Sequence, residues 1–265
     1  MWDTERRNEN TMNLDKMSTI EVIDAIQVEN MNATKAVAAV CGEISTVVDA
    51  VYERMKKGGR LFYIGCGTSG RLGVLDASEC PPTYGVSKDL VIGIIAGGDY
   101  ALRNSVEGSE DNFENGKIDL AKFNITDKDS IIGISVAGGA KYVLGAIELG
   151  KNSGALTVCL ASNKDCALSR MCDYSIITQT GAEVVTGSTR MKAGTAHKMV
   201  LNMISTAVMV KLGYVYENLM INLRPLNEKL KGRMIRITSD ILHCTLDEAE
   251  DRLNKNNWII KEAIK

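Results

Sequence analysis

Five short, continuous apolar runs recur along the middle of the chain, and stretches with helical periodicity separate them. The runs occupy residues 61–64, 90–95, 131–136, 156–160 and 174–177. Such runs are typical of strands that are buried on both faces. The helical stretches lie at residues 69–79, 100–121, 141–152 and 164–171. Strands that alternate with helices predict parallel βαβ units, and hence a three-layer α/β fold around a mostly parallel five-stranded sheet.

Helical patterns flank this alternating region on both sides. Residues 1–17 are polar and loop-like, and a capping-box pattern at residues 18–21 predicts the start of a helix. The other flanking helices are predicted at residues 34–57, at 193–212 and within 226–265, where residues 245–248 form a second cap pattern. We therefore predict a main domain of residues 1–225 with an N-terminal helical extension, and a short helical appendage of residues 226–265.

The composition is that of an ordinary globular protein, with 45% hydrophobic and 24% charged residues. A net charge of −2 and 5% aromatic residues provide no basis for binding nucleic acid or an anionic membrane surface. No run approaches the ~20 apolar residues that a membrane helix needs, and the first residues lack the apolar core of a signal peptide. We expect a cytoplasmic protein whose partners include neither nucleic acid nor a membrane.

The cysteines and histidines argue against a metal site. Seven cysteines contain no Cys-x-x-Cys pair, and the chain has only two histidines. A zinc site needs about four suitably spaced ligands of these types, so we predict no metal. Most of the cysteines are expected to be small buried residues in a reducing compartment.

The first apolar run ends in a glycine-rich turn, Gly65-Cys66-Gly67-Thr68-Ser69-Gly70, that opens a helix. Amide groups at a helix start and the helix dipole attract anions, glycine permits close approach, and hydroxyls add donors. The spacing also matches the Gly-x-Gly-x-x-Gly pattern of dinucleotide sites. However, the acidic residue that such a site places at the end of the second strand is missing. We favour a phosphate monoester over a nucleotide, with a purely structural turn as the remaining interpretation.

A second segment rich in glycine, hydroxyl and cationic side chains lies at residues 186–195, where the predicted helix at 193–212 begins. Alone, it would be a capped helix with solvated charges; beside the first turn in an α/β sheet, it is better explained as the other half of one anion site. Glu79 and Glu110 are the candidate acid and base, because two carboxylates in different surroundings can divide these roles. Spacing alone does not establish this pair, since a single glutamate is far more often a surface residue.

Three segments carry long, specific motifs. They are Gly67-Thr68-Ser69-Gly70-Arg71-Leu72-Gly73, Asp76-Ala77-Ser78-Glu79-Cys80-Pro81-Pro82 and the thirteen residues 183–195. These segments resemble the N-acetylmuramic acid 6-phosphate etherases, a family of the sugar isomerase (SIS) fold class that is related to glucokinase regulatory protein. The likeness covers roughly residues 4–250, with further matches at 95–98 and 107–111.

The resemblance implies a carbon–oxygen lyase that acts on a sugar phosphate without cofactor or metal. On the family pattern, Glu110 removes the C2 proton of the opened sugar, while Glu79 protonates the departing D-lactyl oxygen and then activates water. The implied products are N-acetylglucosamine 6-phosphate and D-lactate. A homodimer is also implied, with the site near the subunit boundary. The implied substrate- and phosphate-binding residues are Gly67, Thr68, Ser69, Gly70, Ser78, Ser135, Ser188, Thr189 and Lys192.

The chain departs from the family pattern after the third predicted strand. The etherases usually carry a Ser-Gly-Arg-Thr-Pro loop there, and this chain has Ala137-Gly138-Gly139-Ala140-Lys141. A hydroxyl and an arginine are thereby missing, and the loss of a charged hydrogen bond weakens phosphate binding by about 1.5–3 kcal/mol. The alternative function is therefore a non-catalytic sugar-phosphate-binding regulator that resembles glucokinase regulatory protein.

Overall fold

The computed structural model describes residues 2–225 and 227–265, and a five-stranded sheet lies at its centre. The strand order is β2-β1-β3-β4-β5, and every pairing in this sheet is parallel. Each strand overlaps one of the predicted apolar runs, because a strand covered on both faces needs apolar side chains on both. The bounds are β1 (Leu61–Gly65), β2 (Val91–Ile95), β3 (Ser130–Ile134), β4 (Leu156–Ala161) and β5 (Tyr174–Ile177).

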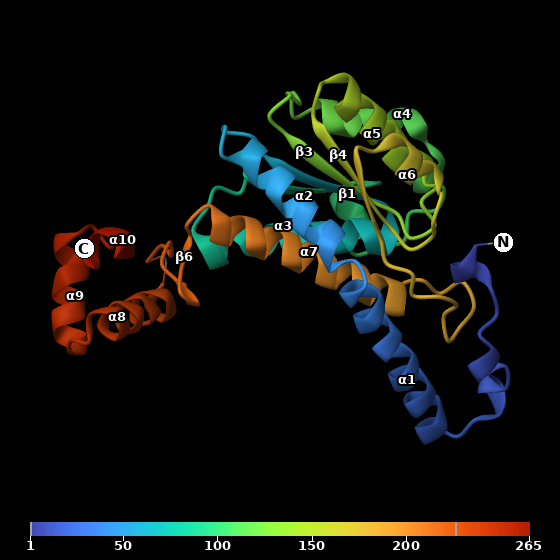
Figure 1. Ribbon diagram of the computed structural model, residues 1–265, viewed down its shortest axis with the longest axis horizontal. Helices are drawn as coiled ribbons and strands as arrows, with labels where there is room; N and C mark the ends of the chain where they lie inside the picture. Colours follow the sequence, from blue (N-terminus) through green and yellow to red (C-terminus); the bar gives the residue numbers. More distant parts are fainter. Residues whose placement is uncertain (1, 226) are drawn as a thin grey trace.

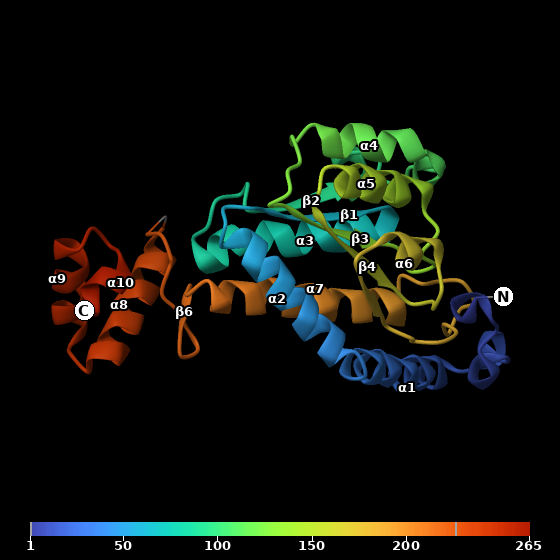
Figure 2. The same cartoon turned by 45° about the horizontal axis from the view of Figure 1, so that its top comes forward.

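Two helical layers cover the sheet, one on each face (Figures 1 and 2). Side chains of β1 alternate between the layers: Tyr63 packs in one apolar core, whereas Phe62 and Ile64 pack in the other. This arrangement confirms the predicted three-layer α/β fold. The Tyr63 side is covered by α2 (Cys41–Met55), α3 (Gly67–Tyr84) and α7 (Lys192–Lys211), and the Phe62 side by α4 (Phe113–Ala121), α5 (Lys141–Asn152) and α6 (Ala167–Met171).

The N-terminal region is more ordered than the predicted loop. Three short 3₁₀ turns precede α1 (Thr19–Ala38), which begins with the predicted capping box: Glu21 accepts a hydrogen bond from the Ser18 amide (2.7 Å). The single helix predicted at 34–57 is wrong, because the chain leaves the helical conformation at Val40. The resulting bend lets α1 pack against α7 and project past the sheet, while α2 covers the sheet (Figure 2).

The helix after β1 is longer than predicted. We expected it to end before two consecutive prolines, yet α3 continues through Pro81 and Pro82 to Tyr84. Proline fixes its φ angle at a value that is compatible with a helix, but it has no backbone N–H to donate a hydrogen bond. Gly85 then ends the helix in the left-handed conformation, where its amide donates to the Pro81 carbonyl oxygen (2.8 Å).

The helix predicted at 100–121 is wrong over its first half, because only α4 is a regular α-helix. Residues 97–111 form an irregular segment that contains two 3₁₀ turns. Gly97, Gly98 and Gly108 in this segment have φ angles of 87°, 66° and 70°. Such positive angles interrupt a helix and are readily adopted only by glycine.

The C-terminal residues form a small helical unit at one end of the molecule (Figure 1). Its apolar side chains pack in a cluster of their own, and Thr245 with Glu248 forms the predicted capping box. The domain division at 225/226 stays a prediction, and Met1 and Leu226 lie outside the described residues. None of the described helices is long and apolar enough to cross a membrane. The unit comprises β6 (Val215–Tyr216), β7 (Leu219–Met220), α8 (Glu228–Leu242), α9 (Leu246–Lys255) and α10 (Ile260–Ala263).

Candidate active site

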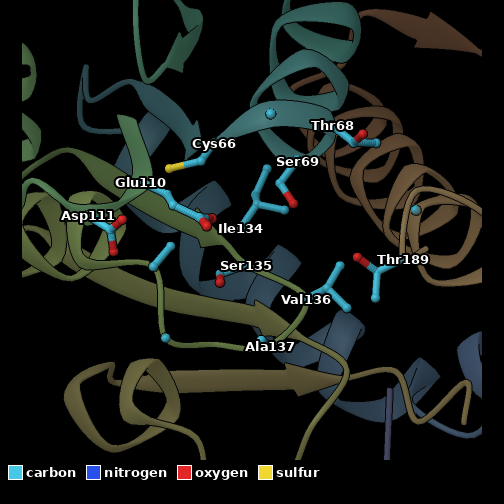
Figure 3. A pocket seen from close by; sticks show the side chains of 14 residues that line it. Cys66, Thr68, Ser69, Glu110, Asp111, Ile134, Ser135, Val136, Ala137 and Thr189 are labelled. Carbon is cyan, nitrogen blue, oxygen red and sulfur yellow. The ribbon is translucent and has the colours of Figure 1, made fainter. Parts of the chain in front are cut away.

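A cavity of about 390 Å³ opens at the carboxyl ends of β1 and β3 (Figure 3). Parallel α/β sheets bind their ligands at this end, and small-ligand sites span roughly 300–1,000 Å³. A second hollow of about 710 Å³ lies beside the edge strand β2 and contains none of the predicted site residues. The first cavity is lined by Cys66, Gly67, Thr68, Ser69, Glu110, Asp111, Ile134, Ser135, Val136, Ala137, Gly139, Ala140, Thr189 and Gly194.

The turn after β1 begins α3 without a side-chain cap. Cys66 occupies the N-cap position, and its side chain accepts no hydrogen bond from the helix. A Cβ at Gly70 would lie 2.6 Å from the Gly65 carbonyl oxygen, so the close packing of helix and strand requires glycine there. The first amides of α3 lie at the cavity wall together with the hydroxyls of Thr68 and Ser69. This arrangement of donors and helix dipole favours an anion.

Helices α3 and α7 run parallel, so that both begin at the cavity. Near their starts, a Cβ on Gly194 would lie 3.6 Å from Cγ2 of Thr68. Eight residues further along each helix, the Asn202 amide donates to the Asp76 carboxylate (2.6 Å). Parallel helices present their positive ends in the same direction, which strengthens the attraction of an anion to this end of the sheet.

The start of α7 already has an anionic cap. The buried Glu183 carboxylate accepts hydrogen bonds from the backbone amides of Lys192 (3.2 Å) and Ala193 (2.9 Å). Burial raises the pKa of Glu183, and these two amides act in the opposite direction. Because Glu183 occupies the first donors of α7, the start of α3 is the better position for a bound phosphate.

The loop after β3 forms a wall that contains few side-chain donors. β3 ends two residues earlier than predicted, so that Ser135 lies in the loop, where its side chain accepts a hydrogen bond from the Gly138 amide (3.1 Å). Ala137 and Ala140 line the cavity with methyl groups, and Gly139, which has no side chain, lines it with backbone. Contacts from this wall to an anion would therefore come from backbone amides and the Ser135 hydroxyl.

The irregular segment before α4 carries Glu110 into the cavity (Figure 3). Arg71 of α3 holds this segment, because its guanidinium donates to the carbonyl oxygens of Leu102 (3.1 Å) and Asn104 (2.9 Å). Gly108 immediately precedes the 3₁₀ turn that contains Glu110. A residue on α3 thus holds the segment that places the candidate base in the same cavity as the candidate phosphate site.

Two carboxylates and a thiol share one side of the cavity. Burial, and then the negative charges of Glu110 and Asp111, raise the pKa of the Cys66 thiol to about 12. Since the thiolate is the nucleophilic form, Cys66 is unsuited to covalent catalysis near neutral pH. In residues 2–225 and 227–265, no three His, Cys, Asp or Glu side chains are grouped so that they could hold a metal ion. The chemistry that these side chains can supply is proton transfer by carboxylates.

Most of the predicted site residues meet in this cavity. Gly70 is buried directly behind the turn, against β1. The predicted residues that line the cavity are Gly67, Thr68, Ser69, Glu110, Ser135 and Thr189.

The remaining predicted site residues lie elsewhere. Glu79 and Ser78 are exposed on α3, and the Ser78 hydroxyl donates to the carbonyl oxygen of Leu75 (2.8 Å). At about 1.5 Å per residue, Glu79 is roughly 18 Å along α3 from Gly67. Ser188 is half-buried in the turn before Thr189 and is not among the lining residues.

Lys192 is engaged in a buried ion pair. Its ammonium donates to Glu29 of α1, and both side chains are at least 95% buried. Burial opposes the charge on Glu29, but hydrogen bonds from Lys192, Asn10 and Asn8 outweigh that effect and lower its pKa to about 2. Lys192 therefore joins α7 to α1 and is not among the lining residues, and its contact with a ligand stays a prediction.

Sequence reasoning missed Asp111, Gly194 and Glu183. The first directly follows Glu110, and Gly194 lies within the second predicted anion-binding segment, so that local spacing could have suggested both. Glu183 opens the third motif, but its contacts with the start of α7 depend on how the intervening loop folds.

Known proteins match the chain over nearly its whole length. The N-acetylmuramic acid 6-phosphate etherase of Caldanaerobacter subterraneus subsp. tengcongensis is 50% identical over 261 residues, which cover 98% of this chain and 85% of that protein. The chain belongs to the N-acetylmuramic acid 6-phosphate etherase family. The etherase of Halalkalibacterium halodurans is similarly 49% identical over 98% of this chain and 88% of that protein.

Domain models and a solved structure agree on the fold of this etherase-family chain. The model of the glucokinase regulatory protein N-terminal SIS domain matches residues 43–151, and the SIS domain model matches residues 113–207. A phosphoheptose isomerase from Francisella tularensis superimposes with a TM-score of 0.52 at 16% identity, covering 73% of this chain and 100% of that one. The three-layer α/β fold is thus an SIS fold, as predicted.

Proposed function

We propose that the chain cleaves the D-lactyl ether of N-acetylmuramic acid 6-phosphate, giving N-acetylglucosamine 6-phosphate and D-lactate. The observation that carries this proposal is the placement of Glu110 in a cavity that is also lined by the uncapped start of α3. Such a cavity can hold a phosphate ester beside a proton-transfer group. The proposal also rests on the 50% identity to an etherase, and the regulator alternative has no comparable support.

In the proposed complex, the phosphate lies at the start of α3. Donors would come from the first amides of that helix, from Thr68 and Ser69, and from Thr189 on the facing wall. This placement leaves the sugar ring between α3 and Glu110 (Figure 3). Helix amides are preorganised donors, so that they lose little freedom when a ligand binds.

The reaction begins with the opened sugar, whose C1 aldehyde makes the C2 proton acidic. Glu110 takes this proton as the bond from C3 to the lactyl oxygen breaks, and an acid protonates the departing oxygen. A C2–C3 double bond remains. Water then adds at C3, one of its protons goes to the group that served as acid, and Glu110 returns its proton to C2. One water is consumed, and each carboxyl group returns to its starting state.

We assign the acid role to Glu79 of a second copy of the chain. Within one chain, Glu79 lies roughly 18 Å along α3 from the helix start at the cavity. Exposed apolar side chains occur on the two neighbouring helices α3 and α7: Leu75 is 48%, Met203 39% and Val210 48% exposed. Exposed apolar side chains on two helices that pack side by side favour a protein interface. A symmetric homodimer through these helices would provide two equivalent sites, each with Glu79 from the partner.

We also propose a cytoplasmic location and a role in recycling cell-wall sugars. All seven cysteines are present as thiols. Unpaired cysteines in this number suit a reducing compartment.

The wall formed by the loop after β3 leads to a gain-of-affinity prediction. Ala137 lines the cavity, and the family pattern places the serine of its Ser-Gly-Arg-Thr-Pro loop there. We expect Ala137→Ser to lower the dissociation constant of N-acetylglucosamine 6-phosphate about three- to tenfold, because one added hydrogen bond contributes about 0.5–1.5 kcal/mol. Calorimetric titration measures the change. N-acetylglucosamine without phosphate is the control ligand, and an equal gain for both ligands would place the new contact away from the phosphate.

The proposed function is tested by incubating the purified protein with N-acetylmuramic acid 6-phosphate. We expect D-lactate and N-acetylglucosamine 6-phosphate in equal amounts, measured by a lactate dehydrogenase assay and by mass spectrometry. If high protein concentrations release no lactate, the proposal fails. If the sugar phosphate instead stabilises the protein against heat without turnover, the regulator alternative is favoured.

A further inference from the structure

The N-terminal segment, defined here as residues 2–17, is hydrogen-bonded to a loop that follows β4. Thr4 and Asn163 are both buried and bond to each other twice: the Thr4 amide donates to Asn163 Oδ1 (3.5 Å), and Asn163 Nδ2 donates to Thr4 Oγ1 (3.0 Å). Asn163 Nδ2 also donates to the carbonyl oxygen of Val136 (3.3 Å), a residue that lines the cavity. One buried amide thus joins the N-terminal segment to the cavity wall after β3.

Two other side chains of this segment bond to the stretch of chain that leads to Thr189. Asn8 donates to the carbonyl oxygen of Ala182 (3.1 Å), and Thr11 donates to that of Val184 (2.9 Å). Both side chains are more than nine-tenths buried. The accepting carbonyls belong to the irregular stretch that leads to Thr189. Irregular backbone has no ladder of partners, so that these side chains determine where it lies.

The intervening residue Glu183 connects this stretch to α7 through its two bonds to the helix amides. The N-terminal segment reaches the same helix by a second route, because Asn10 donates to Glu29 (3.2 Å), the partner of Lys192. Glu5 lies over the turn as well: its Oε2 is 3.4 Å from the position that a Cβ would take on Gly187. The segment therefore bonds to the stretch that precedes α7 at Ala182 and Val184 and lies close to it at Gly187.

We infer that the N-terminal segment positions both walls of the cavity for sugar-phosphate binding, with Thr4, Asn8 and Thr11 as positioning residues. The inference rests on the proposed function, since it takes the cavity as a sugar-phosphate site. These residues act through the carbonyl groups that they hold and do not touch the ligand. Their removal loosens the placement of Val136 and Thr189 and leaves Glu110 in place, because none of them bonds to the segment that carries Glu110, which Arg71 of α3 holds at Leu102 and Asn104.

The test compares ligand affinity and turnover in the full-length chain. We expect Asn8→Ala and Thr11→Val each to raise the dissociation constant of N-acetylglucosamine 6-phosphate about three- to tenfold. The turnover number should change less than twofold, because the proton-transfer groups stay in place. Hydrogen exchange of the amides at 182–190 should become faster in both variants.

Matched controls separate positioning from general destabilisation. Asn13→Ala makes the same change as Asn8→Ala, but at an exposed residue of the segment whose side chain caps no helix. Thr11→Ser keeps the hydroxyl that Thr11→Val removes. Both controls should bind within twofold of the parent. Unchanged affinity in Thr11→Val, or equal losses in Thr11→Ser and Thr11→Val, would overturn the inference.

If Asn8→Ala does not fold, the comparison of Thr11→Val with Thr11→Ser decides alone. If the parent chain binds no sugar phosphate, it is the proposed function that fails, and the exchange rates at 182–190 still test the positioning.

Discussion

Replacing Glu110 by glutamine is expected to reduce D-lactate release by at least a hundredfold while leaving N-acetylglucosamine 6-phosphate binding within about threefold. Glutamine has nearly the same shape, but it cannot take up the C2 proton. A positioned general base contributes roughly 10²–10⁴ in rate, which sets the size of the expected loss. Initial rates of lactate release and calorimetric titration on the same preparation measure the two effects separately.

Glu107 provides the matched control for this variant. It lies on the same irregular segment and accepts a hydrogen bond from the Ser105 hydroxyl (2.6 Å), yet it does not line the cavity. Glu107→Gln removes the same charge from the same segment and should keep more than half of the activity. Near-normal lactate release by Glu110→Gln would remove Glu110 from the mechanism.

Replacing Glu79 by glutamine is expected to have an effect of similar size, although Glu79 lies on the outer surface of α3. The departing lactyl alkoxide is a poor leaving group without a proton, and the amide of glutamine cannot supply one. Binding of N-acetylglucosamine 6-phosphate should be retained. Glu53→Gln on α2 removes another exposed helix carboxylate and should be fully active. Full activity of Glu79→Gln would show that another group protonates the lactyl oxygen.

The sequence predicts the sheet well and the connections less well. Continuous apolar runs identify the strands because burial on both faces leaves little room for polar side chains. The helix predicted at 100–121 is wrong over its first half because Gly108, with its positive φ angle, overrides the helical periodicity of its neighbours. Pro81 and Pro82 mislead in the other direction, since the last turn of α3 tolerates their missing amides.

Half of the cavity follows from local patterns, because the glycine-rich turn lies directly after a strand and thus at the ligand end of the sheet. Lys192 illustrates what local patterns cannot reveal. It lies in a motif rich in anion-binding residues, yet its ammonium pairs with Glu29, which is 163 residues away in sequence. Glu79 shows a different limit: its separation from Gly67 along the chain does not say whether it serves its own cavity or a partner's.

We propose that each site combines Glu110 of one chain with Glu79 of another. Co-expression of Glu110→Gln and Glu79→Gln chains with different affinity tags allows the mixed dimer to be purified. In such a dimer, one site has both carboxylates and the other has neither. We expect about half of the parent activity per mixed dimer, although each variant alone is nearly inactive. A mixed dimer no more active than either variant alone would contradict the shared site.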